Sequence, residues 1–143
     1  MKLQEKKPTL ILVDVQKTFL DEEYWGGNRN NKKTESICGI ILNKGRELNL
    51  PIFHVRHSST DINSKLHKLN KGFEFNEHVQ PTARMVGNFR YDRYLISDAT
   101  ATFYRIGINR EKYDSETIHL TTFANFNEEF ATIYDSEKLM MLL

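Results

Sequence analysis

The chain has 143 residues, of which 39% are hydrophobic and 27% are charged, and its formal net charge is +1. This length and composition predict one globular domain over residues 1–143 and exclude a disordered chain. The nearly balanced charge gives no reason to expect a nucleic acid or an anionic membrane surface as a partner.

Two further features indicate where such a chain works. Apolar stretches such as Leu10–Val13 are far too short to span a bilayer, and the charged N-terminus lacks the apolar core of a secretory signal. The single cysteine, Cys38, excludes an internal disulfide and is typical of a reducing compartment. We therefore expect a cytoplasmic protein with no membrane partner.

The first predicted element is a strand over Thr9–Val15, a continuous apolar run that is typical of a strand buried on both faces of a parallel sheet. The segment Lys17–Asn31 predicts a loop, because Gly26, Gly27 and three asparagines break any periodicity.

A helix is predicted next, with apolar residues at helical spacing from Thr34 onward. Thr34 or Ser36 is a candidate cap for its start, and Asn49 is the expected stop. A second strand follows over Pro51–His57. This β-α-β order with short connections predicts a right-handed crossover and a parallel pair of strands.

The second half of the chain has weaker patterns. Ser58–Pro81 is polar and irregular, and Asp98–Tyr113 is predicted to be a loop. The remaining predicted elements are helices at Thr82–Phe89 and Ser115–Asn127 (capped by Asp114 or Ser115), strands at Asp92–Ser97 and Phe130–Tyr134, and a final helical turn at Ser136–Leu143.

These elements predict an α/β fold with a mostly parallel sheet. In such sheets ligands bind beyond the carboxyl ends of the strands. Asp14, His57 and Asp98 each stand at the end of a predicted strand, so they are the first candidates for a binding or catalytic site.

Several segments together resemble the isochorismatase-like cysteine hydrolases. The run LILVDVQKTF matches the family's first strand and its D-x-Q-x-x-F signature at Asp14, Gln16 and Phe19. PIFHVRHSS resembles the second strand, Thr82–Arg105 includes the S-D-A-T-A-T loop, and EFATIYDSEKL resembles the last strand and helix. The resemblance covers nearly the whole chain and implies a Rossmann-like three-layer α/β/α fold.

The resemblance also implies a chemistry. In the family a cysteine thiolate attacks a carbonyl carbon, an aspartate carries the thiol proton to the leaving group, and a lysine stabilises the pair. Some branches, including the isochorismatases themselves, lack the cysteine and form no covalent intermediate. No metal or cofactor is expected. Of the three groups, only the aspartate is carried over, to Asp14.

The cysteine and the lysine fall in a gap. By family comparison an internal deletion on the order of forty residues lies between Pro81 and Thr82, enough for the crossover that joins two parallel strands. The missing piece comprises a strand, a helix, a second strand and the first turn of the nucleophile helix. Reading backwards from Thr82 puts the cysteine's position near His78, although EHVQP fits the upstream segment at least as well.

Other residues have a functional and a structural interpretation. Gln16, Phe19, Trp25 and His57 are candidates for the pocket; for Trp25 a packed surface loop is equally compatible with the pattern. Cys38 is more readily a small buried hydrophobe than a nucleophile. Residues favoured as structural or solvated are Arg84, Asn88, Asp98, Thr100, His67, His78 and His119.

A metal site is not expected at the H-V-R-H sequence. His54 and His57 are three residues apart on a predicted strand, so their side chains point to opposite faces. No lysine stands on an apolar strand either; Lys65, Lys68 and Lys71 are in the polar segment.

The gap has a consequence for the sheet. The first strand would pair directly with the Asp92–Ser97 strand, pair with a strand from another chain, or expose a central edge. We therefore expect a homo-oligomer or segment exchange. The functional expectation is a hydrolase of a small amide or vinyl-ether metabolite by descent, impaired by the missing cysteine and lysine. The alternative is a non-catalytic relic that binds a small ligand or only assembles.

Overall fold

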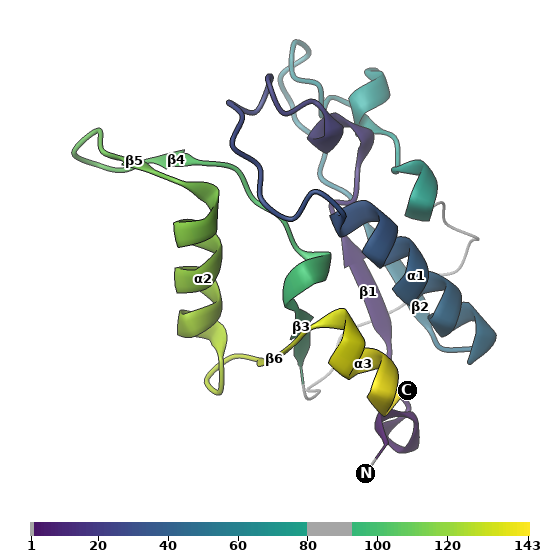
Figure 1. The fold of residues 1–143 in the computed structure, drawn as a ribbon. Helices are drawn as coiled ribbons and strands as arrows, with labels where there is room; N and C mark the ends of the chain where they lie inside the picture. The colour runs from purple at the N-terminus through teal and green to yellow at the C-terminus, as the bar shows by residue number, and fades with distance from the viewer. Residues whose placement is uncertain (1, 80–92) are drawn as a thin grey trace.

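The computed structural model describes residues 2–79 and 93–143, and within them it has short strand pairs and three α-helices (Figure 1). The strands are β1 (Leu10–Val13), β2 (Ile52–Val55), β3 (Tyr94–Ile96), β4 (Arg105–Ile106), β5 (Lys112–Tyr113) and β6 (Thr132–Tyr134). The α-helices are α1 (Thr34–Glu47), α2 (Ser115–Phe126) and α3 (Ser136–Leu142). Single 3-10 turns are η1 (Leu3–Lys6), η2 (Lys17–Leu20), η3 (Lys71–Phe73), η4 (Glu77–Val79) and η5 (Ser97–Ala99).

Two of the strand pairs are parallel, as the β-α-β pattern predicts. β1 pairs with β2 from Leu10 opposite Ile52 to Val13 opposite Val55, and α1 connects the two strands. β3 pairs with β6, with Tyr94 opposite Thr132. The α/β class is therefore confirmed.

The parallel pairs do not join into one sheet in the described part of the chain. There β1 is bonded only to β2, and β3 only to β6. The first of the three arrangements expected for β1, direct pairing with β3, is therefore wrong. Both pairs are instead held through helices, since Leu10 and the β3 residues Tyr94 and Ile96 pack on one apolar cluster.

Helix α1 contributes buried side chains to both apolar clusters of the core. Its buried Cys38 and Leu42 pack with Leu12 of β1 and Val79 of η4. A second cluster joins its Ile41 to both ends of the chain, through Leu3 and Leu139. Each such side chain contributes about 1.5–3 kcal/mol on burial. Figure 1 shows α3 and the two termini close together at one end of the molecule.

The ends of the helices follow local chemistry. Asn49 has a left-handed φ of 53° just after α1, which confirms it as the stop. The carboxylate of Asp114 accepts a hydrogen bond of 2.9 Å from the Thr117 amide, so Asp114 is the cap of α2. The cap predicted for α1 is wrong. The helix begins at Thr34, and the hydroxyl groups of Thr34 and Ser36 donate to the carbonyls three residues before them.

The segment predicted as a loop over Asp98–Tyr113 contains a hairpin. Strands β4 and β5 pair antiparallel, with Arg105 opposite Tyr113, around a turn at which Arg110 has a φ of 66°. Strands of two residues are too short to give a recognisable alternation. Figure 1 shows this hairpin projecting away from the parallel pairs.

Some predictions cannot be compared with the structure. The Thr82–Phe89 helix, with Arg84 and Asn88, and the junction at Pro81 and Thr82 lie outside the described residues. Within the described ranges, the helices are all too short or too polar to cross a bilayer.

Candidate active site

Asp14 stands immediately after β1 in an unusual backbone conformation. Its φ is 56°, in the left-handed region that non-glycine residues rarely adopt, while its amide still donates to the Val55 carbonyl at 2.9 Å. Within residues 2–79 and 93–143 its half-buried carboxylate has no hydrogen-bond or ion-pair partner. Strained residues of this kind cluster at active sites. The sequence predicts the position of Asp14 but gives no sign of its strain.

Gln16 fixes the chain around Asp14. Its side chain is fully buried, and its amide oxygen accepts from the His57 backbone N–H at 2.9 Å. Its Nε2 donates to the carbonyls of His57 (3.1 Å) and Phe73 (2.9 Å). One side chain thus ties the end of β2 and the turn η3 to the end of β1. His57 is brought to the same edge as Asp14, with its side chain exposed.

Phe19 and Trp25 come together with a third ring. The Trp25 ring lies 5.2 Å from Phe19 and 6.2 Å from Phe103, measured between centroids. The indole N–H donates to the backbone carbonyl (3.1 Å) and the hydroxyl (3.2 Å) of Thr18, which orients the ring. Phe103 was missed by the sequence reasoning, although it directly follows the S-D-A-T-A-T motif.

Two loop asparagines explain how Phe103 reaches this cluster. The Asn30 side chain accepts from the Thr102 amide at 2.8 Å, and Asn31 Nδ2 donates to the carbonyls of Ser97 (3.1 Å) and Thr100 (2.7 Å). The loop after η2 is thereby bound to the loop after β3. The asparagines that appear in the sequence only as loop formers therefore connect the two parallel strand pairs.

His119 corrects one prediction. It is not solvated or a cap, because its side chain is only 8% exposed. Its Nε2 is 3.3 Å from Asn31 Nδ2, and its ring meets Phe123 edge-on at 4.4 Å. Burial lowers its pKa below the ordinary value of 6.5, against a smaller opposing effect of Glu116.

Asp98 and Thr100 have structural partners, as favoured from the sequence. The Asp98 carboxylate accepts from the Ser136 amide (2.8 Å) and hydroxyl (2.5 Å), which fixes the start of α3. The Thr100 hydroxyl donates to the Ile96 carbonyl at 2.9 Å.

Cys38 is buried inside the core and faces a carbonyl. Its side chain is 3% exposed, and its thiol lies 3.4 Å from the Ala99 carbonyl oxygen. Burial raises the pKa of Cys38 to about 11, helped by the nearby carboxylates of Glu35 and Asp98. The interpretation of Cys38 as a buried hydrophobe fits this environment, because a nucleophilic cysteine needs a lowered pKa.

Glu35 belongs to a buried ion pair that the sequence did not reveal. Arg29 donates to Glu35 at 2.5 Å, and both side chains are less than a tenth exposed. No pattern in the sequence distinguishes this pair from the many exposed charges, because its burial depends on packing between the loop and α1.

His54 lies on β2, and His57 lies two residues beyond the end of that strand. The ring of His54 packs edge-on to Phe75 at 5.5 Å, and burial lowers its pKa. Among the described residues no group of three potential metal ligands occurs.

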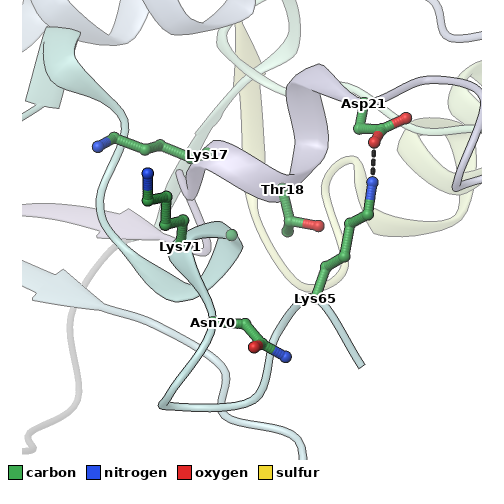
Figure 2. Close-up of a pocket in the computed structure, with 7 residues that line it drawn as sticks. Lys17, Thr18, Asp21, Lys65, Asn70 and Lys71 are labelled. Atoms are coloured by element: carbon green, nitrogen blue, oxygen red, sulfur yellow. Dashed lines mark hydrogen bonds and ion pairs between the residues drawn. The ribbon is translucent and has the colours of Figure 1, made fainter. Parts of the chain in front are cut away.

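A hollow of about 390 Å³ lies beside η2 (Figure 2). It is lined by Lys17, Thr18, Asp21, Lys65, Asn70, Lys71 and Gly72. Lys65 pairs with Asp21, and Lys17 pairs with Glu74. Asp14 does not line this hollow, and these two lysines are bound to other carboxylates.

The geometry described here agrees with comparisons to known proteins, although no family model matches the chain. Its fold is that of isochorismatase-like α/β hydrolases. An isochorismatase-family protein from Chromobacterium violaceum ATCC 12472 superimposes with a TM-score of 0.86 at 22% identity, over 99% of this chain and 96% of that one. A cysteine hydrolase from Pseudomonas syringae pv. phaseolicola 1448A gives a TM-score of 0.77 at 13% identity, over 94% and 92% of the two chains.

Sequence similarity narrows the class to a family. The chain is 33% identical over 181 residues to the uncharacterized isochorismatase family protein YrdC of Bacillus subtilis (strain 168), with 95% of this chain and 96% of the relative covered. The chain therefore belongs to the isochorismatase family, which confirms the family resemblance found in the sequence.

Proposed function

We propose that this chain is an isochorismatase-family hydrolase of a small amide or vinyl-ether metabolite by descent, and that its activity is impaired. One observation carries the proposal. Cys38 is the only cysteine of the sequence, and it is buried in α1 with a pKa of about 11. At neutral pH almost none of it is thiolate, the form that attacks a carbonyl.

Asp14 supports descent from a working enzyme. Its carboxylate stands at the carboxyl end of β1, where ligands bind in such sheets. Its left-handed backbone and its lack of a partner in the described residues leave the carboxylate available for proton transfer. Because burial keeps the Cys38 thiol protonated, Asp14 has no thiolate nucleophile to work with.

The proposed deletion between Pro81 and Thr82 accounts for the missing groups. In its support, the alignment with the Bacillus subtilis relative runs over 181 residues, whereas this chain has only 143. Two separate parallel pairs are also what remains when a strand between β1 and β3 is removed from a continuous sheet. No lysine or cysteine occurs in residues 80–92.

The pocket that we propose lies around Asp14. His57 is at the end of β2, held by Gln16, and the rings of Phe19 and Trp25 lie on the segment that follows β1. A small molecule would stack on these rings with its polar group toward Asp14. The single buried thiol fits a cytoplasmic location.

The test is a turnover screen with small amides and an isochorismate-like vinyl ether, using wild type, Asp14→Asn and Cys38→Ala. We expect no wild-type turnover above the rate of Asp14→Asn, because the only thiol is buried and protonated. Asp14→Asn is the control, since the isosteric amide removes only the proton acceptor. Wild-type turnover that disappears in Asp14→Asn would contradict the proposal that the activity is impaired. Loss in Cys38→Ala as well, with the fold retained, would assign Cys38 as nucleophile.

The alternative is a non-catalytic module that binds a small ligand or only assembles. The aromatic cluster of Phe19, Trp25 and Phe103 favours ligand binding, since stacked rings offer a flat apolar surface. Trp25 is the only tryptophan, so its fluorescence reports on this cluster alone. Saturable quenching of the Trp25 fluorescence by the same amides or vinyl ether, without turnover, supports the ligand-binding module. Fluorescence that does not change at any ligand concentration excludes binding of these ligands at the cluster.

A further inference from the structure

Helix α2 is buried only along a narrow stripe. Its buried residues are Ser115, His119 and Phe123, which recur every four residues. The Ser115 amide donates to Asn28 Oδ1 at 2.9 Å. His119 Nε2 lies 3.3 Å from Asn31 Nδ2, so the stripe faces the loop that holds both asparagines. Figure 1 shows α2 on the far side of β3 from β1, so the face opposite the stripe, the outer face, points away from β1 and its neighbours.

The composition of α2 is not that of a helix surrounded by water. Besides the buried His119, Glu116 is its only acidic or basic residue, although 27% of the whole chain is charged. Outside the buried stripe, Leu120 is 59% exposed and Phe126 is 42% exposed. A helix that packs on one stripe is expected to be polar elsewhere. Uncharged, partly apolar surface of this kind is typical of a face that another protein surface covers.

The outer face of α2 can be covered at little cost in hydrogen bonds. It carries Thr117, Thr121 and Ala124, which the helical period places about half a turn from His119. The Thr121 hydroxyl donates to the Thr117 carbonyl at 2.7 Å, and the Thr117 hydroxyl donates to the Asp114 carboxylate at 2.7 Å. Both hydroxyls therefore keep a partner when water is excluded. The small size of these side chains also lets a second helix approach closely.

Opposite charges stand at the two ends of α2. The basic hairpin, Arg105–Tyr113, precedes the helix with three basic residues and one acidic residue, and its Ile108 is 98% exposed. The acidic turn follows the helix with Glu128 and Glu129, beside Phe130, which is 50% exposed. In the described part of the chain neither glutamate has an ion-pair partner. Figure 1 shows the hairpin extending beyond α2, so it overhangs one end of the outer face.

We propose that a second copy of this chain packs its α2 antiparallel against the outer face of α2, about a twofold axis between Leu120 and Thr121. This axis brings the basic hairpin of each copy to the acidic turn of the other, with Arg110 near Glu129. The charges identify the occupant, because one chain supplies both the basic and the acidic surface. A parallel pair of helices would instead bring hairpin to hairpin, where like charges repel.

The interface is isologous, as in most dimers. It uses no residue of the candidate active site around Asp14, and it does not depend on whether the chain hydrolyses any substrate. Loss of the dimer and loss of turnover are therefore separate outcomes.

The first test is the solution mass by light scattering. Wild type should show a concentration-dependent rise to twice the 16.8 kDa chain mass. Leu120→Lys should stay at the mass of one chain, because it puts two like charges beside the axis. Leu69→Lys is the matched control, since Leu69 is 74% exposed in the segment between β2 and η3, and it should dimerise as wild type does. A wild type that stays monomeric, or equal effects of both variants, overturns the proposal.

The second test reverses charges at exposed residues outside α2, so it holds even if Leu120→Lys fails to fold. Arg110→Glu and Glu129→Lys should each raise the dissociation constant of the dimer about tenfold, because the twofold axis repeats each contact. The two substitutions in one chain should restore dimerisation close to that of wild type, since opposite charges then face each other again. A double variant that dimerises no more tightly than the single variants, or single variants that dimerise as wild type does, rejects the antiparallel arrangement.

Discussion

Gln16 organises the candidate site without needing to touch a substrate. Its buried amide group makes three hydrogen bonds to backbone groups of His57 and Phe73. A polar side chain that is fully buried is retained where it satisfies other buried polar groups. The glutamine of the D-x-Q signature therefore has a structural role at this position. That Gln16 also lines the pocket stays a prediction.

Replacing Gln16 by leucine should destabilise the fold strongly. The change leaves the backbone groups of His57 and Phe73 without their partners, at a cost of roughly 2–4 kcal/mol in the free energy of unfolding. Urea unfolding followed by circular dichroism measures it. Asn43→Ala is the control: it removes an exposed hydrogen bond to Arg46 and should cost about 0.5 kcal/mol or less. Similar losses for both variants would refute the role of Gln16.

His119 predicts a pH dependence of stability. Its folded pKa is lowered by burial, so the unfolded chain binds more protons below the ordinary value of 6.5. The stability that the neutral ring contributes is present above pH 6.5 and is lost as the pH falls from there through the lowered pKa of the folded state. Thermal unfolding should therefore occur at lower temperature under mildly acidic conditions, and His119→Gln should show a smaller loss. If His119→Gln loses as much thermal stability on acidification as wild type does, His119 is not the source of the pH dependence.

For single residues, the sequence predicts those positions that are determined by the residues next to them in the chain. Asp14 follows an apolar run and Asp114 precedes a helix, so both are recognised from their neighbours. Phe103 and the buried side of His119 are not, because their surroundings come from segments far along the chain, joined by Asn30 and Asn31.

Among the elements, α1 packs closely on its neighbours at two glycines. Its Gly39 faces η4: an added Cβ would lie 3.0 Å from the His78 carbonyl oxygen. At Gly45 the nearest atoms would be side-chain carbons, with Leu10 Cδ2 at 3.3 Å. A backbone carbonyl moves less readily than the tip of a leucine.

The two glycines therefore give a matched pair of substitutions. Alanine is favoured over glycine in a helix by about 1 kcal/mol, so Gly45→Ala should be neutral or stabilising. Gly39→Ala should be less stable than Gly45→Ala by roughly 1 kcal/mol or more, because η4 has to shift. Chemical denaturation of the two variants measures the difference. Gly39→Ala being as stable as Gly45→Ala would show that η4 is not held against α1.

Elements were predicted in proportion to their length. The 14-residue helix α1 has nearly four turns of periodicity, whereas β4 and β5 have two residues each and give no alternation. The start of α1 at Thr34 is predicted correctly, but its cap is not, because hydroxyl side chains at Thr34 and Ser36 resemble caps in sequence while their bonds run backward to preceding carbonyls.

For the whole molecule, the family and the α/β class follow from the sequence, but the state of the sheet does not. Whether two strands pair depends on which other strands lie beside them in the folded chain. No local sequence pattern therefore predicts whether β1 forms hydrogen bonds with β3. The structure gives two parallel pairs bound through α1, α3 and the asparagine loop. We propose that Asp14, at the end of the first strand of this family fold, has lost its nucleophile.

The reactivity of Cys38 in the native protein tests this account most directly. With a pKa of about 11, about one thiol in a thousand is ionised at pH 8. We predict that a disulfide reagent labels native Cys38 slowly, at the same rate in wild type and in Asp14→Asn, and roughly a hundredfold faster or more in denaturant. Rapid labelling of the native protein that slows in Asp14→Asn would contradict the account, because it would show a thiolate activated by Asp14.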